Sequence, residues 1–511
     1  MPTERSAVAA LCRRLVALPG FVAGVVWTFV YSVLVITGQR FDAAYLDYGW
    51  QLIPWNVLTD DPIRSVWYLH IQPPGWNLVL GLAGWASPLG DRITVQAVMF
   101  VFGVAGAVLA ARLAGRLGLG HRASTVVAIV ATGNPEVLRG AFEPTYELAI
   151  GTLLLAAVLL VFRVLEATDA RSITRRAVAL SVVVTAVVMT RSLYHPVIIG
   201  AVLALALWPM RRFLDRRSAL RLVVATLAVP LVLVGGWMAK NQMLFGTPTL
   251  SSWFGMNLQR AVIPVLDLDD LEAMHAAGEV SDIAMIGPFG DYDMYADVVE
   301  PCTPGHDHPA LAEPDRSTDA TSPNFNYECY LPIFERAGRD ARAVMLEHPA
   351  VWLEGRLWSL RNTFAVSMNP SRSDSVAMRL LDDVYSVARL DYRGVLSTTG
   401  WGTPVYGFME APTDFSVTTV LLYGVLTLLT VRALAPRRWR RRRSVVDVPT
   451  ALAGLFAIFT VVVGAVGELG EQSRFRTAVD PVVVTTVVAL AWCAVAGRRR
   501  GGQSQAVSVG E

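Results

Sequence analysis

Ten apolar segments, separated by polar loops, are the feature that most limits what this chain can fold into. Most are long enough to cross a hydrocarbon core of about 30 Å. Only 17% of the residues are charged, whereas a soluble domain carries about 25%. The sequence therefore predicts an all-α polytopic membrane protein with about ten transmembrane helices. They are expected at residues 18–37, 93–114, 123–139, 145–165, 177–190, 196–209, 219–238, 415–433, 449–467 and 478–496.

Arginine clusters predict the orientation of these helices. Short cytoplasmic loops carry an excess of basic residues, and every cluster falls on one side of the ten-helix arrangement. Both termini are therefore expected in the cytoplasm. An Arg-rich, Ala/Val-rich composition is typical of bacterial genomes of high GC content, so the expected location is a bacterial plasma membrane. The clusters are Arg13 and Arg14; Arg112, Arg116 and Arg122; Arg171, Arg175 and Arg176; Arg211, Arg212, Arg216 and Arg217; residues 437–443; and Arg498 to Arg500.

The same topology predicts four parts of the chain. A transmembrane module of seven helices covers 1–238, with a first outer loop at 38–92. A large extracytoplasmic loop domain, α or mixed, covers 239–413. Three further transmembrane helices lie in 414–497, and 498–511 is a cytoplasmic tail.

Two features of the outer loops carry further expectations. Residues 76–89 are too short for a span and are bounded by Pro73-Pro74, so we expect an amphipathic helix lying on the outer surface. Cys302 and Cys329 share the large loop, where a disulfide is plausible in an oxidising compartment. Two free thiols are the alternative.

Ionisable side chains collect at the outer ends of the predicted helices. Such groups at membrane depth cost roughly 2.5–3.5 kcal/mol each on insertion scales, so they tend to face a cavity and mark a working site. Each alone has a simpler explanation, such as a helix-end carboxylate or an arginine that snorkels to the interface. Together they indicate a site that binds an anionic lipid head group and activates a nucleophile. The group comprises Asp42, Asp47, Asp60, Asp61, Arg64, His70, Glu143, Glu147, Arg191, His195, Lys240, Glu468, Glu471, Arg474 and Arg476.

Three stretches resemble those of a known family, the GT-C superfamily of membrane glycosyltransferases, which includes protein mannosyltransferases and the lipid A aminoarabinose transferase. They are "FDAAYLDYGWQLI" (41–53), "HIQPPGWNLVLGL" (70–82) and "EQSRFRTAVDP" (471–481). In the family an acidic pair, typically Asp-Glu, opens the first outer loop. Here the second acidic position is Ala43, which leaves Asp42 with Asp47 as substitute or partner. One carboxylate is a poor Mg²⁺ or Mn²⁺ site, so a divalent metal is possible but not supported, and no cofactor is expected.

The resemblance implies the substrates and the roles of the site residues. The donor is a polyprenyl-phosphate-linked sugar whose lipid chain lies in the outer leaflet of the membrane. The acceptor is a glycan, a lipid or a protein. Asp42 is the first candidate for general base and Asp47 the second. Arg474 and Arg476 are the first candidates for binding the donor phosphate, followed by Arg191, His195 and Lys240. Glu143, Glu147 and Glu471 are placed with the acceptor.

His70 has two interpretations. In one, the Pro-Pro turn ends the catalytic loop and His70 points toward the donor phosphate or the acceptor. In the other, the stretch is a stiff corner that supports the loop.

Two other functional classes stay open. A transporter or lipid flippase also places ions among interrupted helices, and a non-catalytic scaffold of an envelope-building complex fits the change at Ala43. The basic run at 437–443 lies between predicted spans, so positive-inside retention explains it and no nucleic-acid partner is expected.

Overall fold

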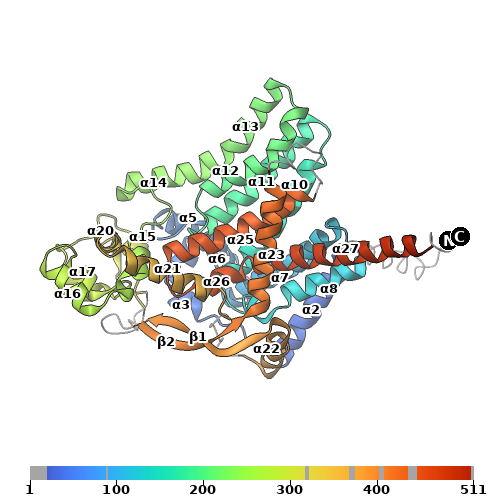
Figure 1. The fold of residues 1–511 in the computed structure, drawn as a ribbon. Helices are drawn as coiled ribbons and strands as arrows, with labels where there is room; N and C mark the ends of the chain where they lie inside the picture. The colour runs from blue at the N-terminus through green and yellow to red at the C-terminus, as the bar shows by residue number, and fades with distance from the viewer. Residues whose placement is uncertain are drawn as a thin grey trace.

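The computed structural model describes residues 20–87, 90–316, 322–366, 374–401, 408–435 and 446–507, and in these ranges the chain is mostly helical (Figure 1). Six helices are long and apolar enough to cross a membrane. This chain is therefore a multi-pass membrane protein. The six are α7 (Asp91–Arg116), α10 (Glu147–Leu165), α11 (Ala170–Thr190), the continuous helix Arg216–Phe245, α23 (Val417–Leu434) and α25 (Asp447–Gly467).

Four shorter helices occupy the remaining predicted spans. The first is α2 (Phe21–Ile36), the second is α12 (Val197–Leu207) with the 3₁₀ turn η1 (Trp208–Phe213), and the third is the apolar part of α27 (Asp480–Val507). The fourth is α8 (His121–Thr132), which stops short of the predicted segment 123–139. The break has a local cause: Pro135 disfavours a helical conformation in Asn134, the residue before it. A new short helix, α9 (Pro135–Arg139), begins there, capped by the Asn134 side chain.

Proline also shapes the helix Arg216–Phe245. It consists of α13 (Arg216–Pro230), a π-helical turn η2 (Leu231–Gly235) and α14 (Gly236–Phe245). Proline lacks a backbone N–H and cannot donate the usual helical hydrogen bond. After Pro230 the backbone hydrogen bonds continue with the i to i+5 spacing of a π-helix, which commonly occurs as a single turn within a longer α-helix. The helix thus extends beyond the predicted 219–238 and carries Lys240 on its last turns.

The first outer loop contains α3 (Tyr45–Tyr48), α4 (Trp55–Asp60), α5 (Pro62–Trp67) and α6 (Gly75–Trp85). A helix is present in this segment as α6, and its polar residue faces the protein interior while apolar residues are exposed. Asn77 is buried, where its side chain accepts a hydrogen bond from Ile53 N (2.9 Å) and donates one to Gln51 O (2.9 Å). Val79, Leu82 and Trp85 are exposed instead. An apolar outer face suits contact with lipid acyl chains, and the polar group inside is satisfied by the loop it supports.

The large loop is a mixed structure that gathers its small helices at one end of the molecule, while α27 projects from the other (Figure 1). Its core contains Phe325, Tyr330 and Phe334, all nearly inaccessible, and Cys302 forms a disulfide with Cys329. Its elements are α15 (Phe254–Val262), η3 (Ile263–Val265), α16 (Leu268–Ala276), α17 (Asp282–Ile286), α18 (Tyr292–Ala296), α19 (Pro309–Ala312), α20 (Tyr330–Glu347), α21 (Pro349–Thr363), α22 (Val376–Arg389), and the antiparallel strands β1 (Asp391–Trp401) and β2 (Phe408–Ser416).

Candidate functional site

The stretch 68–72 is the point where the first outer loop is tied to the large loop. Ser251 Oγ donates to Ile71 O (2.6 Å), and Ser252 N donates to His70 O (2.9 Å). The Asn326 side chain accepts a hydrogen bond from His70 N (2.9 Å) and donates one to Tyr68 O (3.2 Å). Buried backbone groups require such partners. The stretch before the Pro-Pro turn is therefore an anchor between two segments distant in sequence.

His70 is part of this anchor and does not line the cavity described below. It is inaccessible to solvent; its Nε2 lies 3.0 Å from the Asn326 carbonyl oxygen and its Nδ1 lies 2.6 Å from Ser252 Oγ. The carbonyl can only accept, so Nε2 carries the proton and the serine hydroxyl donates to Nδ1. Burial lowers the pKa of His70 to about 3, which keeps the ring neutral. These contacts occupy both ring nitrogens, which is the arrangement expected of a stiff corner that supports the loop.

Lys240 belongs to the same anchor. Its ammonium donates to Leu69 O (2.8 Å) and lies 3.7 Å from the centre of the Trp237 ring. The side chain is buried. A role of Lys240 toward the donor phosphate stays a prediction, and in this structure its ammonium holds the loop backbone.

Six other charged side chains, which we name the central ion cluster, come together from four segments of the chain. Arg474, on α26 (Gln472–Thr477), pairs with Glu147 (2.7 Å) and Glu471 (3.4 Å). Arg191 pairs with Glu147 (3.1 Å). The members are Glu147, Arg191, Arg260, Glu468, Glu471 and Arg474, and Arg260 joins the cluster through Glu468 (3.0 Å) and Glu471 (3.9 Å).

The cluster is held by aromatic rings and by helix ends. Arg191, just after α11, lies 4.5 Å from the Tyr146 ring centre and 4.0 Å from that of Phe475. Glu147 begins α10, where a carboxylate is favoured by the helix dipole. Arg474 Nη2 and Glu147 Oε2 are buried with no hydrogen-bond partner in the part of the chain that the structure describes. Two orphaned polar atoms in one cluster are typical of a site that receives a ligand or water.

A cavity of about 750 Å³ opens beside the central ion cluster. Its polar lining includes Arg191, Arg260, Glu468, Glu471 and His195, while one wall is apolar. Drug-sized ligands occupy cavities of about 300–1,000 Å³. The cavity therefore combines an ionic end with room for a hydrocarbon chain. The apolar wall comprises Leu193, Val197, Met238, Phe254, Phe459, Val462, Val463 and Val466, and Gln72, Asn257, Trp50 and Trp253 complete the polar and aromatic side.

Asp42 is not among the residues lining this cavity, but it lies near the cluster. Its backbone N donates to Phe142 O (2.8 Å), and its Oδ1 accepts from Ala44 N (3.1 Å). The hydrogen bond to Phe142, the residue before Glu143, brings Asp42 beside Glu143. Burial raises the pKa of Glu143 to about 7; Arg474 opposes the shift, and the charges of Glu147 and Asp42 add to it. Asp42, Glu143 and Glu147 thus form a run of mutually repelling carboxylates that leads to Arg474.

The raised pKa of Glu143 predicts a pH-dependent contribution to stability. A carboxyl whose pKa is higher in the folded state stabilises the fold below its unfolded pKa and loses that contribution as the pH rises through about 7. Glu143→Gln should therefore gain thermal stability relative to wild type at pH 8 and show a clearly smaller gain at pH 5. Thermal unfolding of the detergent-purified protein at both values measures this. Glu335→Gln, on the exposed face of α20, is the control, and equal differences at both pH values would contradict the prediction.

Arg476 lies in a separate set of charges, which we name the inner ion cluster. It is 1% exposed, and its guanidinium contacts Glu136 (2.7 Å), Asp480 and Thr363 O (2.8 Å). Each guanidinium nitrogen of Arg476 thus faces a protein acceptor, so binding of the donor phosphate by Arg476 would require one of these contacts to break. The other members are Arg139, Arg389, Asp374, Asp382 and Asp391, which join α9 to α22 and β1.

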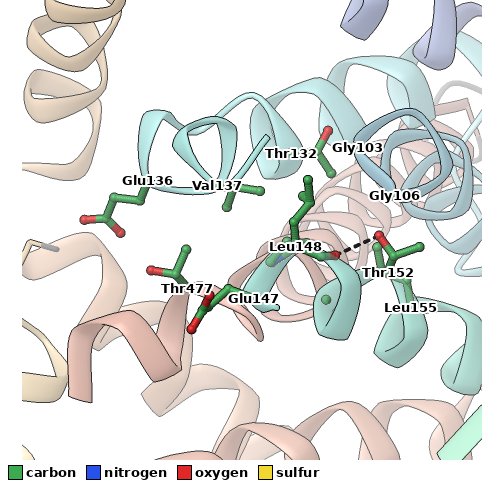
Figure 2. A pocket seen from close by; sticks show the side chains of 13 residues that line it. Gly103, Gly106, Thr132, Glu136, Val137, Glu147, Leu148, Thr152, Leu155 and Thr477 are labelled. Carbon is green, nitrogen blue, oxygen red and sulfur yellow. Dashed lines mark hydrogen bonds between the residues drawn. The ribbon is translucent and has the colours of Figure 1, made fainter. Parts of the chain in front are cut away.

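The two clusters meet across a small cavity. Figure 2 shows Thr477 between Glu136, of the inner ion cluster, and Glu147, of the central ion cluster. The cavity has a volume of about 20 Å³, which is room for one water molecule. The two clusters are therefore neighbours separated by one turn of α26.

Of the remaining predicted residues, Asp47 and His195 are exposed. Asp47 pairs with Arg92 (3.4 Å), and both side chains are more than half exposed. His195 lies on the rim of the large cavity, where its Nδ1 accepts from Val197 N (3.3 Å). The sequence analysis gave no role to Arg260 or to Glu136. Arg260 sits in the acidic loop far from the motifs, and only the fold brings it to Glu468.

No group of three or more metal-ligating side chains is found within the ranges that the structure describes. The carboxylates closest to Asp42 are those of Glu143 and Glu147, while Glu468 and Glu471 line the cavity itself.

No family model matches the chain, and no curated protein matches it. Solved structures do. ArnT from Cupriavidus metallidurans bound to undecaprenyl phosphate is 14% identical, with a TM-score of 0.35, over 89% of this chain and 77% of its own. The apo form of the same protein gives 12% identity and a TM-score of 0.30, over 92% and 76%.

The oligosaccharyltransferase of Archaeoglobus fulgidus, tethered to an acceptor peptide, is 12% identical with a TM-score of 0.31. The match covers 92% of this chain but 50% of the archaeal enzyme, so the chain spans about half of that protein's length.

Proposed function

We propose that this protein is an integral membrane glycosyltransferase that moves a sugar from a polyprenyl-phosphate donor to an acceptor in the bacterial cell envelope. The observation that carries the proposal is the cavity of about 750 Å³, with arginines and glutamates at one end and an apolar wall along the other. A lipid-linked phosphate has the same two parts. The acceptor is a glycan, a lipid or a protein of the envelope.

The charges of the site suit a phosphate once one carboxylate is protonated. The central ion cluster holds three arginines and three glutamates, so it is neutral when all are ionised. Burial raises the pKa of Glu468 to about 7, with Arg260 opposing the shift and the Glu471 charge adding to it. Protonation of Glu468 leaves a net positive charge beside Arg260. Hydrogen bonds to charged groups contribute about 1.5–3 kcal/mol each, so Arg260, Arg191 and Arg474 are the groups we assign to the phosphate.

Asp42 is the group we assign as general base. The acceptor hydroxyl oxygen attacks the anomeric carbon, its proton passes to the Asp42 carboxylate, and the bond from that carbon to the phosphate oxygen breaks. The electron pair leaves with the polyprenyl phosphate, whose charge the arginines stabilise. Displacement from the opposite side inverts the anomeric centre. Asp47 is the second choice, and its exposure beside Arg92, away from the residues that line the cavity, makes it the less favourable one.

The orientation of the chain follows from the arginine clusters. We infer ten spans with both termini in the cytoplasm, so that the central ion cluster and the large loop face the outside of the plasma membrane. The transmembrane module 1–238, the loop domain 239–413 and the C-terminal helices 414–497 are the corresponding parts, with 498–511 as a tail. The disulfide between Cys302 and Cys329 supports an oxidising outer compartment for the loop.

The experiment that tests the proposal is an analysis of the envelope glycans and lipid-linked sugars of a deletion strain. A transferase deletion should lose one sugar linkage and accumulate one polyprenyl-phosphate sugar, and the wild-type gene should reverse both. Val463→Trp, which fills the cavity, should fail to reverse them. Val431→Trp, on the exposed face of α23, is the matched control and should succeed. An unchanged glycan profile, or equal complementation by both variants, would contradict the proposal.

A lipid or sugar transporter and a non-catalytic scaffold remain the competing functions from the sequence. If the protein were a transporter, a second enzyme would have to form the sugar linkage. If it were a scaffold, it would not need the cavity. The central ion cluster lies beside one cavity, at the ends of α11 and α25, and we take this one-sided placement to favour a transferase over a pathway through the membrane.

A further inference from the structure

A second large cavity lies at the opposite ends of the helices from the central ion cluster. It has a volume of about 1030 Å³ and opens between the C-terminal parts of α7 and α10 and the start of α8. The C-terminal end of α10 is the end remote from Glu147, which begins that helix and belongs to the central ion cluster. This cavity is therefore separate from the proposed reaction site, and none of the residues lining it lines the first one.

Positive charge dominates the polar part of the lining. Arg112, Arg116 and Arg163 line the cavity together with His121, and Glu166 is the acidic partner of Arg116. The described residues that line the cavity thus include three arginines and no aspartate or glutamate. Arg176 adds a further guanidinium nearby, because its Nη1 donates to Arg163 O.

A helix start adds neutral donors to the same lining. His121 begins α8, which has no side-chain cap, so its first backbone N–H groups are available to an anion. Ser124 and Thr125 of α8 also line the cavity, but their hydroxyls donate to Leu119 O (3.3 Å) and His121 O (3.2 Å). Guanidinium groups and backbone N–H groups are donors that phosphate groups bind.

The rest of the lining is apolar. Leu109 on α7 and Ala156, Leu159 and Leu160 on α10 lie one to two helical turns deeper into the helices than the arginines. A soluble anion would have no use for such a wall, whereas a phospholipid would place its head group among the arginines and its acyl chains against the leucines. Basic pockets between transmembrane helices on the cytoplasmic side bind anionic lipid head groups in this way.

We propose that this cavity is a binding site for an anionic phospholipid of the cytoplasmic leaflet. The occupant is a phosphodiester lipid such as phosphatidylglycerol, held by Arg112, Arg116 and Arg163. This assignment is independent of the transfer reaction, because it concerns the other end of the helices and is tested by lipid binding alone.

The test is native mass spectrometry of the purified full chain in detergent with an equimolar mixture of phosphatidylglycerol and phosphatidylcholine. Wild type should retain phosphatidylglycerol preferentially. The triple variant Arg112→Gln, Arg116→Gln, Arg163→Gln should lower that preference by about ten-fold or more, since several basic contacts are lost together. The triple variant Arg171→Gln, Arg175→Gln, Arg216→Gln removes the same charge from the starts of α11 and α13 and should leave the preference unchanged.

A second pair of variants separates a built cavity from general charge attraction. Ala156→Trp fills the apolar part and keeps every arginine, so it should also abolish the preference. Val126→Trp, on the exposed side of α8, is its control and should not. Equal loss in both arginine triples, retention in Ala156→Trp, or displacement of the lipid by millimolar inorganic phosphate would each overturn the proposal. So would the absence of retained lipid from wild type.

Discussion

Asp42→Asn is expected to lower sugar transfer by about 10²–10⁴-fold, the usual contribution of a positioned general base. The amide cannot take the acceptor proton at neutral pH. The local fold should persist, because Asp42 N still donates to Phe142 O (2.8 Å) and an amide oxygen can replace Oδ1 as acceptor of Ala44 N (3.1 Å). The measurement is the sugar linkage restored in the deletion strain, together with transfer by isolated membranes, at matched protein levels.

Asp47→Asn is the matched control for this prediction. Asp47 pairs with Arg92 on the surface, with both side chains more than half exposed, and such pairs contribute about 0–1 kcal/mol. Transfer by this variant should stay within about two-fold of wild type. If Asp47→Asn loses activity and Asp42→Asn keeps it, the roles are reversed. If both variants restore the linkage fully, neither carboxylate is the base, and the scaffold or transporter function gains support.

The helices could be predicted well because the signals for them are local. Each of the ten apolar segments contains a helix, since a run of apolar residues has to satisfy its backbone hydrogen bonds within the membrane. The boundaries differ where single residues act: Pro135 splits the segment 123–139, and Pro230 is followed by a π-helical turn that extends the helix to Phe245. The orientation of α6 could not be predicted, because its buried polar residue, Asn77, is satisfied by a loop folded beneath it.

The fold places the predicted site residues in different surroundings, and part of this separation follows from their spacing in the sequence. Arg474 and Arg476 are two residues apart on a helix, and positions i and i+2 do not face each other. That spacing alone implies that they cannot share one phosphate, and the structure sends Arg474 to the central ion cluster and Arg476 to the inner one. Arg260 carried no such signal. Its contact with Glu468 joins segments about two hundred residues apart, which only the packed fold brings together.

The contacts of His70 and Lys240 could likewise not be predicted from the sequence. Both stand beside motifs that a membrane enzyme would use, and both are charged or titratable at the outer face. Their partners are backbone carbonyls and loop hydroxyls, namely Asn326 O, Ser252 Oγ and Leu69 O. A sequence does not show which buried carbonyl groups need a hydrogen-bond donor from a side chain. A side chain that serves as such a donor is therefore easily taken for a ligand-binding group.

Arg476→Met is expected to lower the free energy of unfolding by about 3–5 kcal/mol, the cost of removing one partner from a buried ion pair. The side chain is 1% exposed and contacts Glu136 (2.7 Å) and Asp480. Arg389 remains 3.6 Å from Glu136. Most of the cost therefore falls on Asp480, whose other partner is the Tyr423 hydroxyl (3.0 Å). Denaturant unfolding of the purified protein measures the change.

Two further variants test the cause of that loss. Arg339→Met removes an exposed i,i+4 pair with Glu335 on α20, and pairs of this kind contribute about 0.3–0.5 kcal/mol. Adding Asp480→Asn to Arg476→Met removes the uncompensated charge and should recover part of the stability. If Arg476→Met costs no more than Arg339→Met, the inner ion cluster does not hold α26 against α9 and α27. Arg476 would then be available to a ligand after all, and its original assignment to the donor phosphate would have to be restored.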